Sequence, residues 1–384
     1  MVYLDHNATT PVLPDVAQAM AQALARVGNA SSVHALGRDA RRFVEDARES
    51  VAVLAGARPA EVIFTSGGTE ANNLALRGTG RERVLVSSVE HVSVLDSVAE
   101  AATAPISIPN PNPIPVDGDG VVDIGALEAL LAAAPGPALV SVMLANNETG
   151  VVQPVAKIAE AARRFGVLVH CDAVQGAGKM SLDMAGLGVD LLTLSAHKMG
   201  GPQGIGALIV RDGTPLNPEA RGGGQERRRR AGTENVPAIV GFGVAAAGEG
   251  VAEAPRLRRL RDDLESRVVG VCGGARIFGA GAERLPNTCC VSMPGVANET
   301  QIMALDLAGV AVSAGSACSS GKVESSHVLA AMGVAPEQAA TAIRVSLGHD
   351  TTEDDVSTFL EAWTGLYKRL GEPHDTAVPA PAAA

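Results

Sequence analysis

The chain has 384 residues, of which 46% are hydrophobic but only 2% aromatic, and its formal net charge is −11. This length predicts two domains, or one large and one small, around an aliphatic core rich in small side chains. The negative charge argues against sequence-independent binding of nucleic acid, because such binding requires a basic protein surface. No apolar run reaches the roughly 18 residues of a membrane span, and the first residues lack the apolar stretch of a signal peptide. We therefore expect a cytoplasmic protein.

Six short apolar runs predict β-strands in the first part of the chain. They lie at residues 61–65, 84–87, 139–144, 167–172, 190–195 and 206–210. Helical patterns such as those at residues 69–77 and 155–165 lie between them, whereas the Pro/Asn/Gly-rich residues 110–119 predict a loop. Continuous apolar strands alternating with helices are typical of a mostly parallel sheet covered on both faces. In such a sheet, ligands bind beyond the carboxyl ends of the strands.

After Gly248 the pattern changes to that of a smaller α+β domain. Residues 256–269 predict a charged amphipathic helix, and short strands are expected around residues 288–293, 310–313 and 342–347. The Pro/Ala-rich end of the chain is expected to be disordered. We place a large domain at residues 15–253, a small domain at residues 1–14 and 254–370, and the tail at residues 371–384.

Two glycine-rich segments follow predicted strands. Residues 66–70 (SGGTE) open a helix, where free backbone amides can hold an anion, although a simple helix cap explains the same residues equally well. Lys198 ends the segment SAHK and precedes a glycine-rich turn. Partial desolvation there would lower its pKa and make its amine nucleophilic. On its own, however, an ordinary surface lysine is the simpler interpretation.

Asp172 ends the predicted strand at residues 167–172, and Gln175 follows three residues later. A carboxylate at this place could keep the nitrogen of a heterocycle protonated. Capping of a following helix is the alternative, because that is a common role of Asp.

The five cysteines predict thiols rather than disulfides, because their number is odd and their spacing irregular. They are Cys171, Cys272, Cys289, Cys290 and Cys318. No Cys-x-x-Cys pair suggests zinc. Strand-like surroundings predict that Cys171, Cys289 and Cys290 are buried small apolar residues, and Cys272 has no assignable role. Cys318 lies in a run of small residues that should be mobile, with nothing beside it to pack against.

Two other groups of residues invite a functional interpretation. His6, His34 and His327 are not spaced as a metal site, and for His6 and His34 support of loop structure is favoured over lining a pocket. The four arginines at 227–230 either frame a subunit interface or form a solvated face.

Short motifs follow one another from about residue 3 to about residue 350. They are YLDHNATTP (3–11), NASSVH (29–34), FTSGGTEANN (64–73), EH (90–91), NNETG (146–150), HCDAVQ (170–175), SAHK (195–198), GGGQE (222–226), GT (232–233), SACS (316–319) and IRVS (343–346). In this order they resemble the cysteine desulfurases of the class V aminotransferase-like family, closest to the housekeeping branch that serves iron–sulfur cluster assembly and related thiolation. Each motif is weak alone, but the ordered set is highly specific.

The resemblance implies the fold of the fold-type I enzymes that depend on pyridoxal 5′-phosphate (PLP). In that α/β fold, a large domain with a mostly parallel seven-stranded sheet flanked by helices carries a smaller α+β domain. Lys198 would hold PLP as a Schiff base, Asp172 would pair with the pyridine nitrogen, and His91 would stack on the ring. Arg344, with Asn147, would grip the substrate carboxylate. The full implied cofactor-binding set is Gly68, Thr69, His91, Asn147, Asp172, Gln175, Ser195, His197, Lys198 and Thr233.

Within this implied set, Gln175 and Asn147 would contact the side of the ring that carries its oxygen. Thr233 would reach the phosphate of a neighbouring subunit, so the resemblance implies a homodimer. The implied reaction removes sulfur from L-cysteine, with Lys198, His91 and Cys318 as catalytic residues, and gives L-alanine and a persulfide on Cys318.

Several points stay open at the level of sequence. The sulfur acceptor could belong to iron–sulfur assembly, tRNA thiolation or DNA sulfur modification, and direct binding of nucleic acid is not expected. No intrinsic metal site is expected, although a transient iron–sulfur species at Cys318 is conceivable. A selenocysteine lyase or another class V enzyme is the alternative activity. A scaffold without activity is disfavoured because Lys198, Asp172, His91 and Cys318 are all present.

Overall fold

The structure is a computed structural model that describes residues 1–101, 112–314 and 325–371. A seven-stranded mixed sheet lies at its centre, in the order β2-β8-β7-β6-β5-β3-β4. Strand β8 runs antiparallel to both neighbours, whereas the other pairs in the sheet are parallel. The strands are β2 (Val62–Thr65), β3 (Arg83–Ser87), β4 (Asn112–Ile114), β5 (Ala138–Met143), β6 (Leu168–Asp172), β7 (Leu191–Ser195) and β8 (Gly206–Val210).

The six predicted strands are confirmed, and their ends agree to within one residue. The seventh strand, β4, was missed because residues 110–119 were expected to form a loop. It is a three-residue strand, Asn-Pro-Ile, that pairs only with β3 at the edge of the sheet. Proline is tolerated at such an edge, where its missing N–H leaves no ladder bond unmade. The pairing partner, rather than a local signal, therefore defines this strand.

Helices cover both faces of the sheet and bury alternate strand residues in different cores. One core joins the strands to α2 (Ala35–Ala55), α5 (Ile124–Ala133), α6 (Val155–Arg164) and α8 (Val236–Ala246). The core on the other face contains α3 (Gly68–Gly78) and α4 (Val92–Ala101). Phe64 and Ile63, adjacent in β2, belong to the first and second core respectively, as the two-residue period of a strand requires.

A separate core lies in the C-terminal part of the chain. It packs strand β9 (Thr288–Ser292) and its antiparallel partner β11 (Ala342–Ser346) against α9 (Ala254–Val271) and α13 (Glu353–Leu370). The predicted helix and strands are thus confirmed, whereas the division into domains stays a prediction and residues 372–384 lie outside the described residues. The remaining elements are β1 (Val2–Tyr3), which pairs in parallel with β10 (Val310–Ala311), and helices α1 (Pro14–Leu24), α7 (Met184–Leu187), α10 (Asn298–Leu307), α11 (His327–Ala331) and α12 (Pro336–Ala339).

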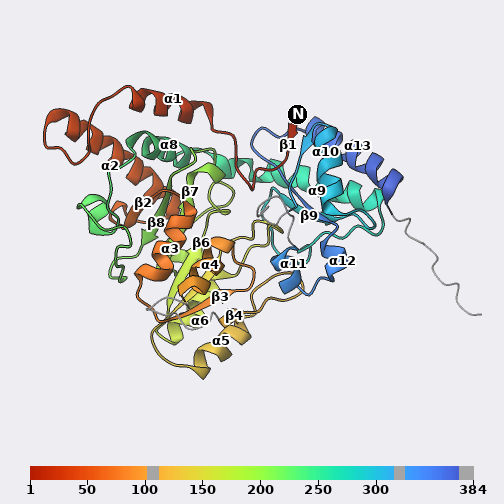
Figure 1. Cartoon of the computed structure of the whole chain (residues 1–384), viewed down its shortest axis with the longest axis horizontal. Helices are drawn as coiled ribbons and strands as arrows, with labels where there is room; N and C mark the ends of the chain where they lie inside the picture. The colour runs from red at the N-terminus through yellow and green to blue at the C-terminus, as the bar shows by residue number, and fades with distance from the viewer. Residues whose placement is uncertain (102–111, 315–324, 372–384) are drawn as a thin grey trace, which may run out of the picture.

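The N-terminal segment connects the two parts of the molecule. Leu4 is buried in the C-terminal core, and Asp5 forms a bridge to Ser346 at the end of β11. The chain then crosses to α1, which packs on α8 (Figure 1). On the way, the Thr10 amide donates to the carbonyl of His197, just after β7. This crossing brings residues 5–10 to the carboxyl ends of the central strands.

Among the described residues, no single helix is long and apolar enough to cross a membrane. One bent pair, α8 together with residues Gly250–Val271, passes only when the two are taken together, by length and composition alone.

Candidate active site

A pocket of about 640 Å³ opens beyond the carboxyl ends of β5, β6 and β7. The start of α3 and the crossing N-terminal segment form part of its wall, and β11 reaches it from the C-terminal part of the chain. The structure brings ten of the predicted site residues together here. They are Gly68, Thr69, His91, Asn147, Asp172, Gln175, Ser195, His197, Lys198 and Arg344.

Lys198 ends a single 3₁₀ turn, residues Ala196–Lys198, directly after β7. Its ammonium group donates to the carbonyl oxygens of Asn7 and Ala8, at 2.6 Å each. Burial, aided by the positive charge of Arg344, lowers the pKa of Lys198 to about 8. The amine is therefore uncharged far more often near neutral pH than that of a surface lysine, as a nucleophile toward a carbonyl requires.

Asp172 ends β6 and holds its carboxylate toward the pocket through two hydrogen bonds. Its Oδ2 accepts from Nδ2 of Asn72 at 2.8 Å, and its Oδ1 accepts from the Val174 amide at 3.0 Å. The residues that follow form turns, so Asp172 caps no helix, and the capping interpretation is wrong. A buried carboxylate pinned in this way can face the protonated nitrogen of a heterocycle.

The hydrogen bonds of His91 determine which of its ring nitrogens is free to donate. The Ser93 amide donates to Nδ1 at 3.1 Å, so Nδ1 acts as an acceptor and Nε2 carries the hydrogen. Burial lowers the pKa of His91, and the charges of Lys198 and His327 add to this effect while Asp172 opposes it. The imidazole is thus neutral and has one N–H available. Ser93 also accepts from Asn72, which links His91 to the Asp172 carboxylate.

The N-terminus of α3 forms an anion cradle at one end of the pocket. No side chain caps the first amides of α3, and a Cβ built on Gly67 would meet no atom within 4 Å. A second hollow, of about 480 Å³, lies over this helix start and is lined by residues 66–70, Ser195 and His197. Free amides at a helix N-terminus beside hydroxyl and imidazole groups suit a phosphate.

The neighbouring His197 is neutral at physiological pH. Burial, with the positive charges of Lys198 and Lys179, lowers the pKa of His197 to about 4. Its Nδ1 lies 3.2 Å from Oγ1 of Thr9. The imidazole therefore meets an anion as a hydrogen-bonding group rather than as a cation.

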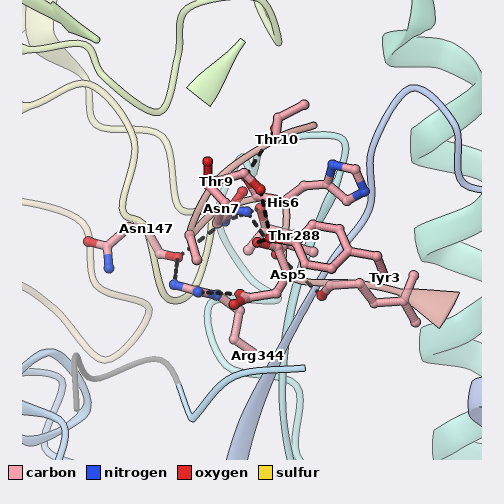
Figure 2. A network of polar contacts seen from close by, with 12 residues as sticks. Tyr3, Asp5, His6, Asn7, Thr9, Thr10, Asn147, Thr288 and Arg344 are labelled. Carbon is pink, nitrogen blue, oxygen red and sulfur yellow. Dashed lines mark hydrogen bonds and ion pairs between the residues drawn. The ribbon is translucent and has the colours of Figure 1, made fainter. Parts of the chain in front are cut away.

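Arg344 projects from β11 into the pocket and is tied to the crossing segment (Figure 2). Its Nη2 lies 2.6 Å from Oδ1 of Asp5, and its Nη1 donates to the carbonyl of Asn147 at 3.0 Å. Its Nε is buried and has no partner among the described residues. The Asn147 carbonyl, and not its side-chain amide, takes part in this network (Figure 2). One donor of the Arg344 guanidinium is thus left unpaired by the described residues.

The residues present fit PLP as a cofactor. The cradle at α3 suits a phosphate, the Lys198 amine suits an aldehyde, and the Asp172 carboxylate suits a pyridine nitrogen. The orphaned Oδ1 of buried Asn72, which lines the same pocket, shows that the polar groups of this wall are not all satisfied by the protein. This is the donor and acceptor set expected of a site that holds such a group.

Thr233, a further predicted residue, is exposed and does not line this pocket, so its expected contact with a neighbouring subunit stays a prediction. Cys318 lies outside the described residues.

The other cysteines are buried, as predicted for three of them. Cys171, Cys289 and Cys290 are at most 2% exposed, and burial raises the pKa of each thiol. Cys272 is fully buried as well. A protonated and inaccessible thiol is a poor nucleophile.

Three histidines without an implied cofactor role fall into two groups. His34 caps α2 by accepting from the Gly37 amide, and His6 is buried edge-on against Tyr3, so both support local structure as favoured. His327, however, lines the pocket and contacts the Glu90 carbonyl at 2.9 Å. From the sequence, His327 was considered only as a metal ligand and so was missed as a pocket residue. Its position eight residues after the SACS motif was the available signal.

The arginine run is not a simple solvated face. Residues Gln225–Arg228 form a 3₁₀ turn in which Glu226, Arg227 and Arg228 all have positive φ. A buried pair between Glu226 and Arg48, at 2.7 Å, holds this strained turn. Arg230 pairs at 2.8 Å with Glu70 in the first turn of α3. One arginine of the run thus supports the anion cradle.

Fold and site together define a class: this is the fold of the fold-type I PLP-dependent enzymes. The chain belongs to the class V aminotransferase family, whose model matches residues 2–359. It is 46% identical to a cysteine desulfurase of Cereibacter sphaeroides over 380 residues, 96% of each chain. It is 42% identical to an IscS-like cysteine desulfurase of Mycobacterium tuberculosis, across 96% of this chain and 97% of that one.

Solved structures agree with these relatives. A NifS-like protein from Rickettsia africae superimposes with a TM-score of 0.88 at 36% identity, covering 96% of this chain and 99% of that chain. The structure of SspA in complex with cysteine matches with a TM-score of 0.79 at 30% identity, covering 91% of this chain and 99% of that one.

Proposed function

We propose that this protein is a PLP-dependent cysteine desulfurase that converts L-cysteine to L-alanine and leaves the sulfur as a persulfide on Cys318. The observation that carries the proposal is the Lys198 amine, whose pKa is lowered to about 8, in one pocket with Asp172 and the amides of α3. The names of the relatives, which are cysteine desulfurases at 40–46% identity, support the same reaction.

In this proposal, different residues of the pocket hold different parts of PLP. Gly68, Thr69, Ser195 and His197 hold the phosphate, and Lys198 holds the cofactor covalently. Asp172 keeps the pyridine nitrogen protonated, since its carboxylate is fixed by Asn72. When bound, PLP supplies an electron sink for the electrons released at Cα of the substrate.

Arg344 and Asn147 orient the substrate. The guanidinium of Arg344 is fixed by Asp5 and by the Asn147 carbonyl, and it retains the unpaired Nε. Binding of the substrate carboxylate there directs the amino group toward Lys198, which lines the same pocket. Because the guanidinium is already held, little conformational freedom is lost when substrate binds.

Proton transfer is assigned to Lys198 and His91. The uncharged Lys198 amine takes the proton from Cα of the substrate, which its lowered pKa permits. His91 is neutral with its hydrogen on Nε2, so it can donate a hydrogen bond or a proton within the pocket.

Sulfur transfer is assigned to Cys318 as a thiolate. Its sulfur attacks the sulfur of the substrate and forms the new S–S bond, while the C–S bond breaks and its electron pair stays with the substrate carbon. Protonation of that carbon gives alanine, so one cysteine becomes one alanine and one persulfide without an added oxidant or reductant. The four other cysteines are buried, which leaves Cys318 as the candidate.

We also propose a homodimer in the cytoplasm that passes sulfur to acceptor proteins. The exposed position of Thr233, away from its own pocket, supports a contact with a second subunit. The four described cysteines are unpaired thiols, which suits a reducing compartment. Acceptors in iron–sulfur assembly, tRNA thiolation or DNA sulfur modification all suit a cysteine persulfide.

The direct test compares alanine release from L-cysteine by the wild-type protein, Cys318→Ser and Lys198→Ala. The wild type should release alanine over many turnovers. C318S should bind PLP normally but release no alanine, and K198A should hold no covalent cofactor. Full turnover by C318S would refute the assignment of the reaction.

A further inference from the structure

A second lysine, Lys179, is buried behind the pocket wall. It lies four residues after Gln175, in the turns that follow β6, and only 8% of it is exposed. Its Nζ donates to Oε1 of Gln175 at 2.7 Å and to Oδ1 of Asn7 at 3.0 Å. Both partners are amide oxygens rather than carboxylates, so the contacts do not resemble an ordinary buried ion pair.

These two contacts fix the orientation of two side-chain amides. A lysine ammonium has N–H donors and no acceptor, so each amide must present its oxygen to Lys179. Asn287 also donates to Oδ1 of Asn7, at 3.2 Å. The NH₂ group of Asn7 therefore faces the other way, toward the carbonyl of Asn147 and Oγ1 of Thr288 (Figure 2).

The consequence for Gln175 is that its NH₂ group is directed to the side of the pocket where Lys198 lies. Nε2 of Gln175 donates to the Asn7 carbonyl at 3.0 Å, and Nζ of Lys198 donates to the same oxygen at 2.6 Å. If the Gln175 amide were reversed, its NH₂ group would meet the N–H groups of Lys179 and its oxygen would face the Asn7 carbonyl. Both new contacts would be repulsive, so Lys179 selects one orientation.

We propose that Lys179 is a positioning residue, which holds the Gln175 amide so that an N–H group, and not its oxygen, faces the ring oxygen of the cofactor. This proposal rests on the proposed function, in which Gln175 contacts that oxygen. An N–H donor stabilises negative charge on the ring oxygen, whereas an amide oxygen in its place would repel it. Lys179 thus controls the cofactor through Gln175 without touching it.

The surroundings of Lys179 are consistent with such a role. Burial lowers the pKa of Lys179 well below its ordinary value, and the charges of Lys198 and Arg344 act in the same direction. Both the charged and the neutral amine have at least two N–H bonds, enough for the two amide oxygens. The two contacts can therefore form in either protonation state.

The experiment measures the pH midpoint at which the visible absorbance band of the PLP-loaded protein titrates. That midpoint reports the proton on the nitrogen that joins Lys198 to the cofactor. A donor to the ring oxygen stabilises the deprotonated form and lowers the midpoint. Lys179→Met removes the donors that fix Gln175, so the midpoint should rise by about one pH unit, a tenfold change in proton affinity.

Matched variants separate positioning from general damage. Gln175→Ala should raise the midpoint in the same direction, and the double variant Q175A/K179M should rise no further than Q175A, since both changes remove one donor. Lys179→Arg still offers N–H donors and no acceptor, so the midpoint of this variant should stay near that of the wild type. Lys157→Met, on the exposed face of α6, should not shift it. PLP content and thermal unfolding are measured for each variant. If K179M does not fold, Lys179→Gln replaces it, and its midpoint should lie between those of the wild type and Q175A.

Two results would overturn the proposal: a K179M or K179Q midpoint equal to that of the wild type, or a full sum of the two shifts in the double variant. Failure of the proposed function is distinguishable, because the wild-type protein would then show no visible band that Lys198→Ala abolishes.

Discussion

The Arg344 guanidinium is paired with Asp5 at 2.6 Å, across 339 positions of the sequence. Arg344 lines the pocket, whereas Asp5 does not. The carboxylate holds one end of the guanidinium (Figure 2). This arrangement makes Asp5 a positioning residue for the group that is proposed to bind the substrate carboxylate.

Replacement of Asp5 by Asn should weaken the binding of L-cysteine. The buried guanidinium would lose its fixed counter-charge and its defined orientation, so KM should rise about tenfold while kcat changes less. The measurement is steady-state release of alanine over a range of cysteine concentrations. The amount of PLP bound should not change, because Asp5 does not line the pocket. Asp15→Asn in the first turn of α1 is the control, and an unchanged KM in D5N would contradict this role.

Asn72→Ala should impair catalysis without preventing the binding of cofactor phosphate. The substitution removes the bond to Oδ2 of Asp172 and the bond to Ser93, which supports His91. Loss of a hydrogen bond to a charged group costs about 1.5–3 kcal/mol, which corresponds to a fall in kcat of roughly 10- to 100-fold. Asn73, whose side chain donates to the Thr69 carbonyl within its own helix, is the matched control. Equal activity of N72A and N73A would show that the Asp172 contact is dispensable.

The site residues that could be predicted from the sequence are those that belong to local sequence motifs. Asp172, Lys198 and the glycines before α3 stand at strand ends, and the rule that ligands bind there placed them together. The roles of Asn7 and Asp5 could not be found in this way, because they depend on where the N-terminal segment crosses the sheet edge. That crossing is fixed by burial of Leu4 in a core formed by residues more than 250 positions away.

Lys179 and β4 show two further limits of the sequence. A lysine in a polar turn carries no sign that it will be buried, because its burial results from packing of the N-terminal segment against the turn. Strand β4 has three residues, one of which is a proline, and only its pairing with β3 makes it a strand. The ion pairs at the arginine run, Arg230 with Glu70 and the adjoining Glu226 with Arg48, could not be predicted for a similar reason, because the partners are distant in sequence.

The stability of the protein should fall as the pH drops from about 6.5 to 4. Burial lowers the pKa of three histidines, His6, His170 and His197, to about 4 in the folded chain. Between that value and about 6.5 the unfolded chain binds more protons, so unfolding takes up about three protons from these groups. The check is the slope of the unfolding free energy against pH from urea titrations of the cofactor-free protein.

His170 offers a variant for that titration. It is fully buried between the hydroxyls of Ser141 and Thr193, at 2.9 Å from each. His170→Gln should reduce the slope by about one proton. A slope in H170Q equal to that of the wild type would show that His170 does not supply one of the three protons.

Sharing of sites between subunits can be tested by mixing two inactive variants, Lys198→Ala and Thr233→Ala. If Thr233 serves the neighbouring site, a hybrid dimer contains one site with both residues intact, and alanine release should reappear on mixing. If Thr233 served its own site, each site of the hybrid would lack one residue and no activity would return. The measurement is alanine release after subunit exchange, with a mixture of T233A and T233A/K198A as the control.

The most direct test of the central claim is the chemical state of Cys318 after one turnover with ³⁵S-labelled L-cysteine. Mass analysis of the peptide that contains Cys318 should show one added sulfur atom, the label should be released by a reducing thiol, and one alanine should form per labelled subunit. Label on another cysteine, or alanine formed without label on Cys318, would contradict the proposed sulfur transfer.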